Sequence, residues 1–207
     1  MKGILILLFV CISICIGAYY YFQKEPIRRV QYILSKPKVL LIQPLGDFDT
    51  QLAKKNLNSL KKNFPSSRLL PNLPLFPSAY YKPRDRYRAD SILKFTRYKY
   101  GIDTLMLLMT HRDIGVTKNR IKDWGIMGLA HRPGSVCVVS TYRLDQSKLA
   151  EQLYKVSIHE LGHTQGLSHC PLKSCYMRDA SGGNPLDEEK GFCPSCKKVM
   201  ENKGWRM

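Results

Sequence analysis

The spacing of three histidines limits what this chain can fold into more than any other feature of its sequence. His159 and His163 are four positions apart, so a helix through them carries both side chains on one face. His169 can join them only if the helix ends in between, and Gly166 can leave a helix with a positive φ at little cost. The window therefore predicts a helix, a sharp turn and three imidazoles that converge on one point.

The residues before this window indicate that the helix is a long one. Leu149, Leu153 and Val156 recur at spacings of four and three, the period of an amphipathic helix. Three imidazole ligands with an open fourth position are typical of a catalytic zinc, because structural zinc sites close that position with protein. Glu160 lies beside the first histidine, placed to take a proton from a metal-bound water. We therefore predict a mononuclear catalytic zinc site here rather than isolated core histidines.

Four further cysteines follow the histidines closely: Cys170, Cys175, Cys193 and Cys196. Two residues separate the last pair and four separate the first pair, and zinc-binding cysteines use both spacings. Four thiolates on one zinc would fold a tail that has little apolar material of its own. Two disulfides are the alternative, since an exported protein would allow them. We favour a second, structural zinc within residues 170–196.

The remainder of the chain alternates short apolar runs with amphipathic segments. The expected strands and helices outside the histidine window are 39–42, 50–64, 86–100, 104–109 and 135–139. The proline-rich stretch 66–83 is expected to be a loop. The pattern predicts an α/β (α+β) fold. We expect one compact domain over residues 30–207 with a mixed sheet, a long active-site helix and a small zinc-stapled C-terminal region.

The first 29 residues differ from the rest of the chain. Residues 3–22 carry no charge and have about the length that crosses a bilayer as a helix. The aromatic run 19–22 resembles the belt of aromatic residues at a membrane interface. We therefore expect residues 1–29 to be a single-pass N-terminal membrane anchor, with the following positive charges favouring a cytoplasmic body. A signal segment that is cleaved during export is the alternative.

The chain is strongly basic, with 33 Lys and Arg against 16 Asp and Glu and a net charge of +17. Such an excess is compatible with an anionic neighbour, such as a membrane surface, nucleic acid or an acidic substrate. The charges are spread along the chain, however, so solubility alone can account for them. We do not expect nucleic acid as a partner, and the sequence leaves the oligomeric state open.

The C-terminal motifs together resemble those of the archaemetzincins, a branch of the metzincin zinc peptidases. That family combines a long zinc-binding motif, a cysteine, a Cys-x-Met and a Cys-x-x-Cys. The corresponding parts of this sequence are 159–169, Cys170, 175–177 and 193–196. With shorter upstream matches, the resemblance extends over roughly residues 38–200. It implies the compact metzincin fold, with a mixed sheet and two long helices.

The resemblance also implies roles for individual residues. His159, His163 and His169 would bind the catalytic zinc, Glu160 would be the general base, and Met177 would be the methionine of the turn beneath the zinc. The four cysteines would hold the second zinc, which gives two Zn²⁺ per chain. The implied function is hydrolysis of peptide bonds in a peptide or protein substrate by a zinc-activated water. The alternatives are a non-catalytic zinc-stabilised basic binding module, which has no need of the glutamate, and hydrolysis of a non-peptide amide.

Overall fold

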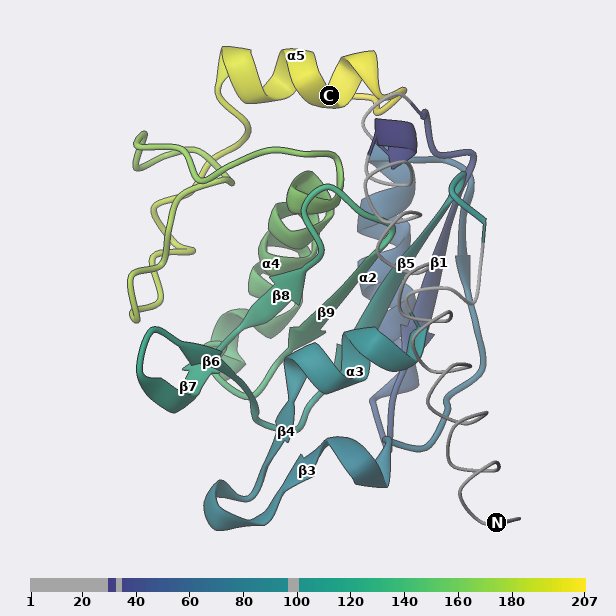
Figure 1. The fold of residues 1–207 in the computed structure, drawn as a ribbon. Coiled ribbons are helices and arrows are strands. Elements are labelled where there is room, and N and C mark those ends of the chain that lie inside the picture. The colour runs from purple at the N-terminus through teal and green to yellow at the C-terminus, as the bar shows by residue number, and fades with distance from the viewer. Residues whose placement is uncertain (1–29, 33–34, 97–100) are drawn as a thin grey trace, which may run out of the picture.

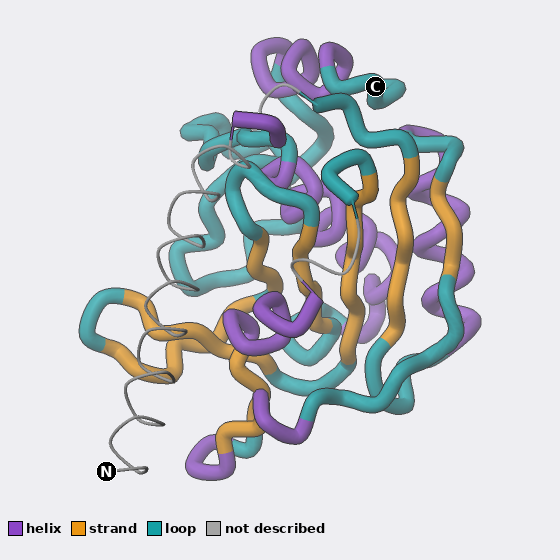
Figure 2. Tube along the Cα trace, turned by 45° about the vertical axis from the view of Figure 1, so that its right-hand side comes forward, coloured by secondary structure: helices purple, strands orange, loops and turns teal. Residues whose placement is uncertain are grey.

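A five-stranded mixed sheet forms the framework of the protein, with helices on both of its faces (Figures 1 and 2). The computed structural model describes residues 30–32, 35–96 and 101–207. The strand order is β2-β1-β5-β9-β8, in which the first four strands run parallel and β8 runs antiparallel to β9. The bounds of these strands are β1 (Val39–Pro44), β2 (Ser67–Leu69), β5 (Thr104–Thr110), β8 (Gly128–Ala130) and β9 (Val136–Ser140).

Four α-helices accompany the sheet in the part of the chain that the structure describes. They are α2 (Thr50–Asn63), α3 (Ala89–Thr96), α4 (Leu149–Thr164) and α5 (Pro194–Asn202). Three short 3₁₀ helices are η1 (Pro77–Ala79), η2 (Lys82–Arg84) and η3 (Gln146–Lys148). Helices α2 and α4 cover one face of the sheet and α3 covers the other, while α5 lies at one end (Figure 1).

Strand β5 is apolar along its length because both of its faces are covered. Leu105, Leu107 and Met109 belong to the core between the sheet and helices α2 and α4. Met106 and Leu108 point to the opposite face and pack in the core under α3. This alternation is the period of two that a strand imposes on its side chains. A continuous apolar run is what a parallel strand buried on both faces requires.

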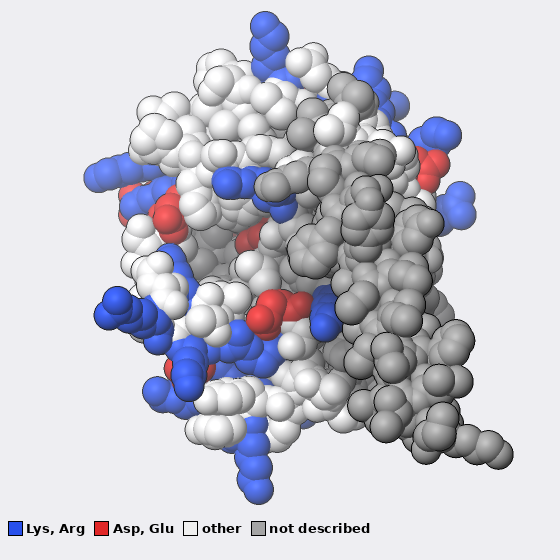
Figure 3. Space-filling model, viewed as in Figure 1, with Lys and Arg blue, Asp and Glu red and all other residues white. Residues whose placement is uncertain are grey.

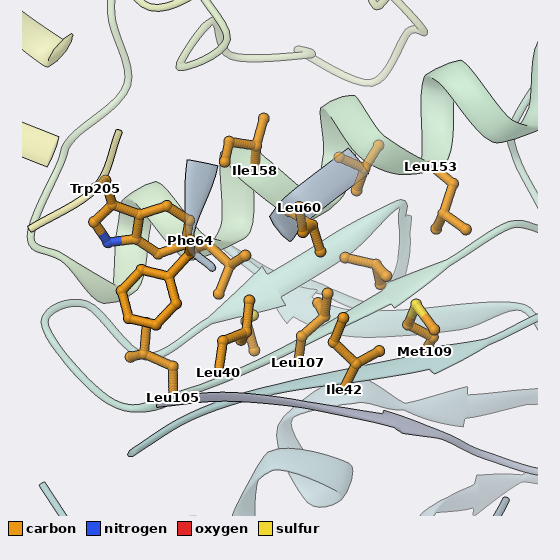
Figure 4. Close-up of a cluster of buried hydrophobic side chains, with 14 of the residues drawn as sticks. Leu40, Ile42, Leu60, Phe64, Leu105, Leu107, Met109, Leu153, Ile158 and Trp205 are labelled. Carbon is orange, nitrogen blue, oxygen red and sulfur yellow. The ribbon is translucent and has the colours of Figure 1, made fainter. Parts of the chain in front are cut away.

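The larger core joins the sheet to α2, α4 and the C-terminus. Figure 4 shows Leu40 and Ile42 of β1 in one apolar cluster with Leu60 of α2. At the edge of this cluster the buried ring of Trp205 packs on Phe64, with ring centroids 4.8 Å apart. The last residues of the chain are therefore held against the end of α2.

A second, four-stranded sheet has the order β3-β4-β6-β7. Its strands are β3 (Tyr80–Tyr81), β4 (Arg86–Arg88), β6 (Ile114–Lys118) and β7 (Ile121–Ile126). The buried carboxylate of Asp113 holds this sheet in place, because it pairs with Arg86 at 3.0 Å and with Arg143 at 2.9 Å. The guanidinium of Arg143 also lies against Gly125 of β7, where it leaves no room for a side chain.

The predicted α/β fold, with its mixed sheet and long C-terminal helix, is confirmed, and two local predictions are wrong. The stretch 66–83 contains strands β2 and β3 as well as loop. The expected helix 86–100 begins later, at Ala89, because residues 86–88 form strand β4. Its expected end, 97–100, lies outside the described residues. Sequence reasoning also missed the β6–β7 hairpin.

The prediction of a single-pass membrane protein is corrected. The expected anchor, residues 1–29, lies outside the residues that the structure describes. Among the described residues no helix is both long enough and apolar enough to cross a bilayer. The longest of them, α4, has 16 residues, whereas the hydrocarbon core of a bilayer requires about 20. The membrane localisation and the membrane as a partner are therefore not retained.

The ion pairs of Asp113 generate a prediction about stability. Asp113→Ala leaves Arg86 and Arg143 without their shared carboxylate in a largely buried place, so the free energy of unfolding should fall by about 2 kcal/mol. Urea denaturation followed by circular dichroism measures this change. The matched control is Glu201→Ala, which removes an exposed pair with Lys197 and should cost less than about 0.5 kcal/mol. Equal losses in the two variants would contradict the role given to Asp113.

Candidate active site

Three histidine side chains meet at the C-terminal end of α4. His159 and His163 lie one turn apart on this helix, and His169 returns to them from the segment that follows it. The metal-binding atoms of the three side chains lie within 4.8 Å of one another, and the Nε2 atoms of His163 and His169 are 3.3 Å apart. The structure thus brings together the three residues that the spacing singled out. Their role as metal ligands remains a prediction at this point.

The turn that returns the third histidine depends on Gly166. Helix α4 ends at Thr164, and Gly166 has a φ of +99°. A residue with a side chain adopts this left-handed conformation only at a cost. The N–H of Gly166 donates to the carbonyl oxygen of His163 at 2.9 Å, which closes the helix end. The predicted positive φ of Gly166 is confirmed.

Hydrogen bonds orient the imidazole rings of the site. Nδ1 of His159 donates to the carbonyl oxygen of Tyr176 at 2.6 Å, and Nδ1 of His163 donates to that of Leu167 at 2.7 Å. These bonds leave both Nε2 atoms free to bind a metal, the arrangement usual for histidine ligands. Burial lowers the pKa of His159 to about 3 and that of His163 to about 4. Both rings are therefore neutral at pH 7, which is the form that binds a metal.

The third imidazole, of His169, has a carboxylate partner. Its Nδ1 lies 3.5 Å from Oδ2 of Asp179, a residue in the loop between Cys175 and Cys193. The backbone N–H of Ser181 donates to Asp179 at 2.9 Å and lowers the pKa of its carboxyl group. An ionised Asp179 suits a histidine that donates from Nδ1 and binds a metal through Nε2. Sequence reasoning did not single out Asp179.

Glu160 is confined between α4 and strand β8. Its side chain is only 6% exposed, and burial raises its pKa to about 8. A Cβ atom at Gly128 would lie 2.5 Å from Oε1 of Glu160, so a side chain at this position would displace the carboxylate. The glycine therefore gives Glu160 the space beside the histidines. In the sequence, Gly128 was noticed only as part of one of the short upstream matches to the archaemetzincin family.

An open cleft of about 370 Å³ lies along the three histidines and Glu160. One wall comes from the β6–β7 hairpin and β8, and the other from residues 178–189. The walls approach each other at Trp124 of β7, since a Cβ atom at Gly182 would lie 3.0 Å from its ring. Figure 3 shows this hollow with Lys and Arg side chains around its margin and acidic atoms inside it.

Met177 lies beneath the histidines and is fully buried. A Cβ atom at Gly162 would lie 2.5 Å from its sulfur, so Met177 packs directly on the turn of α4 that carries the histidines. The carbonyl oxygen of Met177 accepts the N–H of Cys170 at 2.7 Å. This bond ties the segment below the site to the residue that follows His169.

The four predicted cysteine ligands form a second cluster. Their sulfur atoms lie within 4.8 Å of one another as free thiols, and Cys170 Sγ is 3.8 Å from Cys193 Sγ. That separation is nearly twice a disulfide bond, so the structure does not contain the alternative pair of disulfides. The Ser195 hydroxyl donates to Cys193 Sγ at 3.2 Å and lowers the pKa of that thiol to about 6. Four sulfurs at these distances, one of them readily ionised, form a donor set that suits zinc.

A buried acid beside neutral imidazoles in an open cleft is the arrangement that zinc-dependent hydrolases use, and it places the chain in that class. The comparisons narrow the class further. The model of Peptidase family M54 matches residues 78–202, more than half of the chain. The chain belongs to this family of zinc metallopeptidases, the archaemetzincins.

Individual relatives and solved structures agree with this family. Archaemetzincin from Haloarcula marismortui is 28% identical over 171 residues, which cover 76% of this chain and 96% of the relative. The crystal structure of archaemetzincin from Methanopyrus kandleri has a TM-score of 0.67 at 25% identity and covers 80% of this chain and 94% of that one. The structure of archaemetzincin from Archaeoglobus fulgidus complexed with malonate has a TM-score of 0.67 at 28% identity, with coverage of 77% and 98%.

These relationships settle the predicted class of activity. The protein is a zinc metallopeptidase, a hydrolase whose family implies a peptide substrate. Membership of the family favours this enzyme over the non-catalytic binding module.

The contact beneath the histidines generates a second prediction. Gly162→Ala places a methyl group against the sulfur of Met177, so the methionine must move and the helix turn above it must shift. We expect a fall of about 2 kcal/mol in the free energy of unfolding and weaker retention of metal by the histidines. Chemical denaturation and metal analysis after dialysis measure the two effects. The control is Gly191→Ala, whose added methyl group meets nothing within 4 Å; unchanged stability and metal content in Gly162→Ala would contradict the contact.

Proposed function

We propose that this protein hydrolyses peptide bonds with a catalytic zinc held by His159, His163 and His169 and with Glu160 as the general base. The observation that carries the proposal is the meeting of three imidazoles, two of them held neutral, beside a buried carboxylate in an open cleft. The donor set fits zinc, because three neutral nitrogens leave a further position open. We also propose that residues 30–207 form one catalytic domain.

The proposed chemistry divides between the metal and the protein. Zinc at the histidines would supply Lewis acidity, which lowers the pKa of a water molecule and polarises the scissile carbonyl group. Glu160 takes the proton of the attacking water at its carboxylate. Burial alone raises the pKa of Glu160, and the positive charge of a zinc ion at the histidines would lower it again and favour the carboxylate that accepts the proton. The carboxyl group can then pass this proton to the leaving amine. The contact with Gly128 keeps the carboxylate in one place during both transfers.

The edge of the sheet offers a place for an extended peptide. Strand β8 pairs with β9 on one side, and its other side borders the cleft. Unpaired backbone groups at a sheet edge can bind a peptide as an added strand. We propose that the substrate lies in the cleft in this way, antiparallel to β8, with its scissile bond beside Glu160.

We propose that the four cysteines hold a second, structural zinc. Burial raises the pKa of the Cys175 thiol, and the backbone N–H groups of Met177 and Cys193, which donate to its Sγ at 3.5 Å and 3.4 Å, offset part of that rise. The same segment contributes Met177 beneath the histidines. A zinc at the cysteines would therefore fix the support of the catalytic site.

The role of Glu160 is tested by Glu160→Ala. We expect the variant to keep both zinc ions and to lose turnover by several orders of magnitude, because Asp179, the other carboxylate beside the histidines, is engaged by His169 and by the N–H of Ser181. Cleavage of a diverse peptide library, followed by mass spectrometry, measures the loss, and metal analysis checks the zinc content. A variant as active as the wild type would overturn the assignment.

Two variants, each lacking one proposed ligand, test the two zinc sites independently. His163→Ala should bind one zinc ion per chain instead of two and should stay folded, since the cysteine site is intact. Cys196→Ser should lose the other zinc and unfold more readily, because that metal staples the tail. Metal content per chain and thermal unfolding distinguish the two cases. An unchanged metal count in either variant contradicts the ligand assignment.

A further inference from the structure

A third acid in the cleft, Glu189, has no hydrogen-bond partner at its buried oxygen. Its side chain is only 2% exposed, yet it lines the cleft that contains the histidines. Its Oε2 atom is buried and makes no hydrogen bond. A buried polar atom without a partner is costly, and such atoms are rare in folded proteins. Glu189 takes no part in the proposed mechanism.

The basic groups nearest to Glu189 are already engaged. Lys155 Nζ lies 2.6 Å from Oε1 of Glu151 and donates to the carbonyl oxygen of Leu186 at 2.8 Å. Arg178 donates to Oε2 of Glu188 at 2.8 Å. Burial raises the pKa of Glu189 to about 7, and the positive charges of Lys155 and Arg178 offset only part of that rise. The carboxyl group would therefore gain from a further cation.

The surroundings of Glu189 indicate what kind of cation could reach it. The cleft that Glu189 lines includes the apolar side chains of Val156, Pro185 and Leu186. Glu189 lies at the Val156 end of the helix, because the neighbouring Lys155 is close enough to lower its pKa. Apolar walls that lead to an acid fit a side chain with a long aliphatic stem and a cationic end, as in lysine and arginine. A small inorganic cation would make no apolar contacts with those walls.

The direction of the substrate determines which of its side chains lies there. The N–H of Gly134 donates to the carbonyl oxygen of Thr164, so the segment after β8 lies at the end of α4. Gly128, at the start of β8, lies against Glu160, nearly one turn earlier on the helix. An antiparallel peptide therefore runs past Glu160 towards Val156 and the part of the cleft that contains Glu189. The substrate residue that occupies this part of the cleft is therefore the one directly after the scissile bond.

We propose that Glu189 selects peptides that carry lysine or arginine directly after the scissile bond. The inference rests on the proposed peptidase function and on the antiparallel placement of the substrate. It makes Glu189 a specificity residue that contacts the substrate side chain. The bond that is broken and the groups that carry protons are unchanged.

The test uses the full-length, zinc-loaded protein and peptides that differ at one position. Lysine, arginine, norleucine and glutamate follow the scissile bond in turn, and mass spectrometry gives kcat/KM and the cleaved bond. For the wild type we expect the lysine peptide to exceed the norleucine peptide by about tenfold or more. Glu189→Gln should reduce that ratio to about one. Glu201→Gln, the control, should leave the ratio unchanged, because Glu201 lies exposed on α5 and does not line the cleft.

A binding measurement separates recognition from turnover. Titration calorimetry with Glu160→Ala should show tighter binding of the lysine peptide than of the norleucine peptide, and Glu160→Ala/Glu189→Gln should bind both equally. Equal kcat/KM for the two peptides in the wild type overturns the inference, as does a lysine preference that survives in Glu189→Gln. If Glu189→Gln does not fold, the inference is tested by comparing the lysine and norleucine peptides in two proteins: by kcat/KM in the wild type and by binding in Glu160→Ala. Cleavage without a lysine preference contradicts only this inference, whereas cleavage of no peptide at all contradicts the proposed function as well.

Discussion

The close packing of α4 beneath the sheet is the contact on which the rest of the site depends. Leu153, Ile158 and Leu161 are buried in the core that this helix shares with the central strands. The same packing brings β8 so near that a glycine must face Glu160. A slip of one helical turn would move every side chain of α4 by about 5.4 Å and separate the histidines from the cleft. Apolar burial on one side of the helix thus determines the geometry of the polar groups on the other.

The segment after the helix reaches its position by different means. Residues 170–193 contain no helix or strand, and backbone hydrogen bonds link them at a few points, such as Cys170 to Met177 and Tyr176 to Gly191. Met177 and three of the four cysteines lie on this one stretch of chain, and Cys196 follows it in the first turn of α5. The support under the histidines and the sulfur cluster are therefore parts of a single unit. Loss of order at the sulfurs should therefore reach the histidines through Met177 and through the peptide bond between His169 and Cys170.

The features that could be predicted from the sequence are those whose cause is local. The histidine spacing and the positive φ of Gly166 follow from the geometry of one helix and one turn. The β6–β7 hairpin was missed because its outer residues are polar and because Asp113, just before β6, is held by Arg86 and Arg143, which lie far away in the sequence. Glu189 gave no signal at all, since its burial arises only when the loop docks against α4. The expected membrane anchor, residues 1–29, had only an apolar run and its flanking charges behind it, and these residues lie outside the part of the chain that the structure describes.

The two tryptophans of the chain occupy contrasting surroundings. Trp205 is sealed in the core against Phe64, whereas Trp124 lines the cleft and touches the opposite wall at Gly182. The indole in the core will change its fluorescence only when the domain unfolds, and the indole on the cleft wall will respond when a ligand enters. The native protein therefore contains two built-in optical probes, and replacing either tryptophan with phenylalanine would let unfolding and cleft occupancy be followed separately without an attached dye.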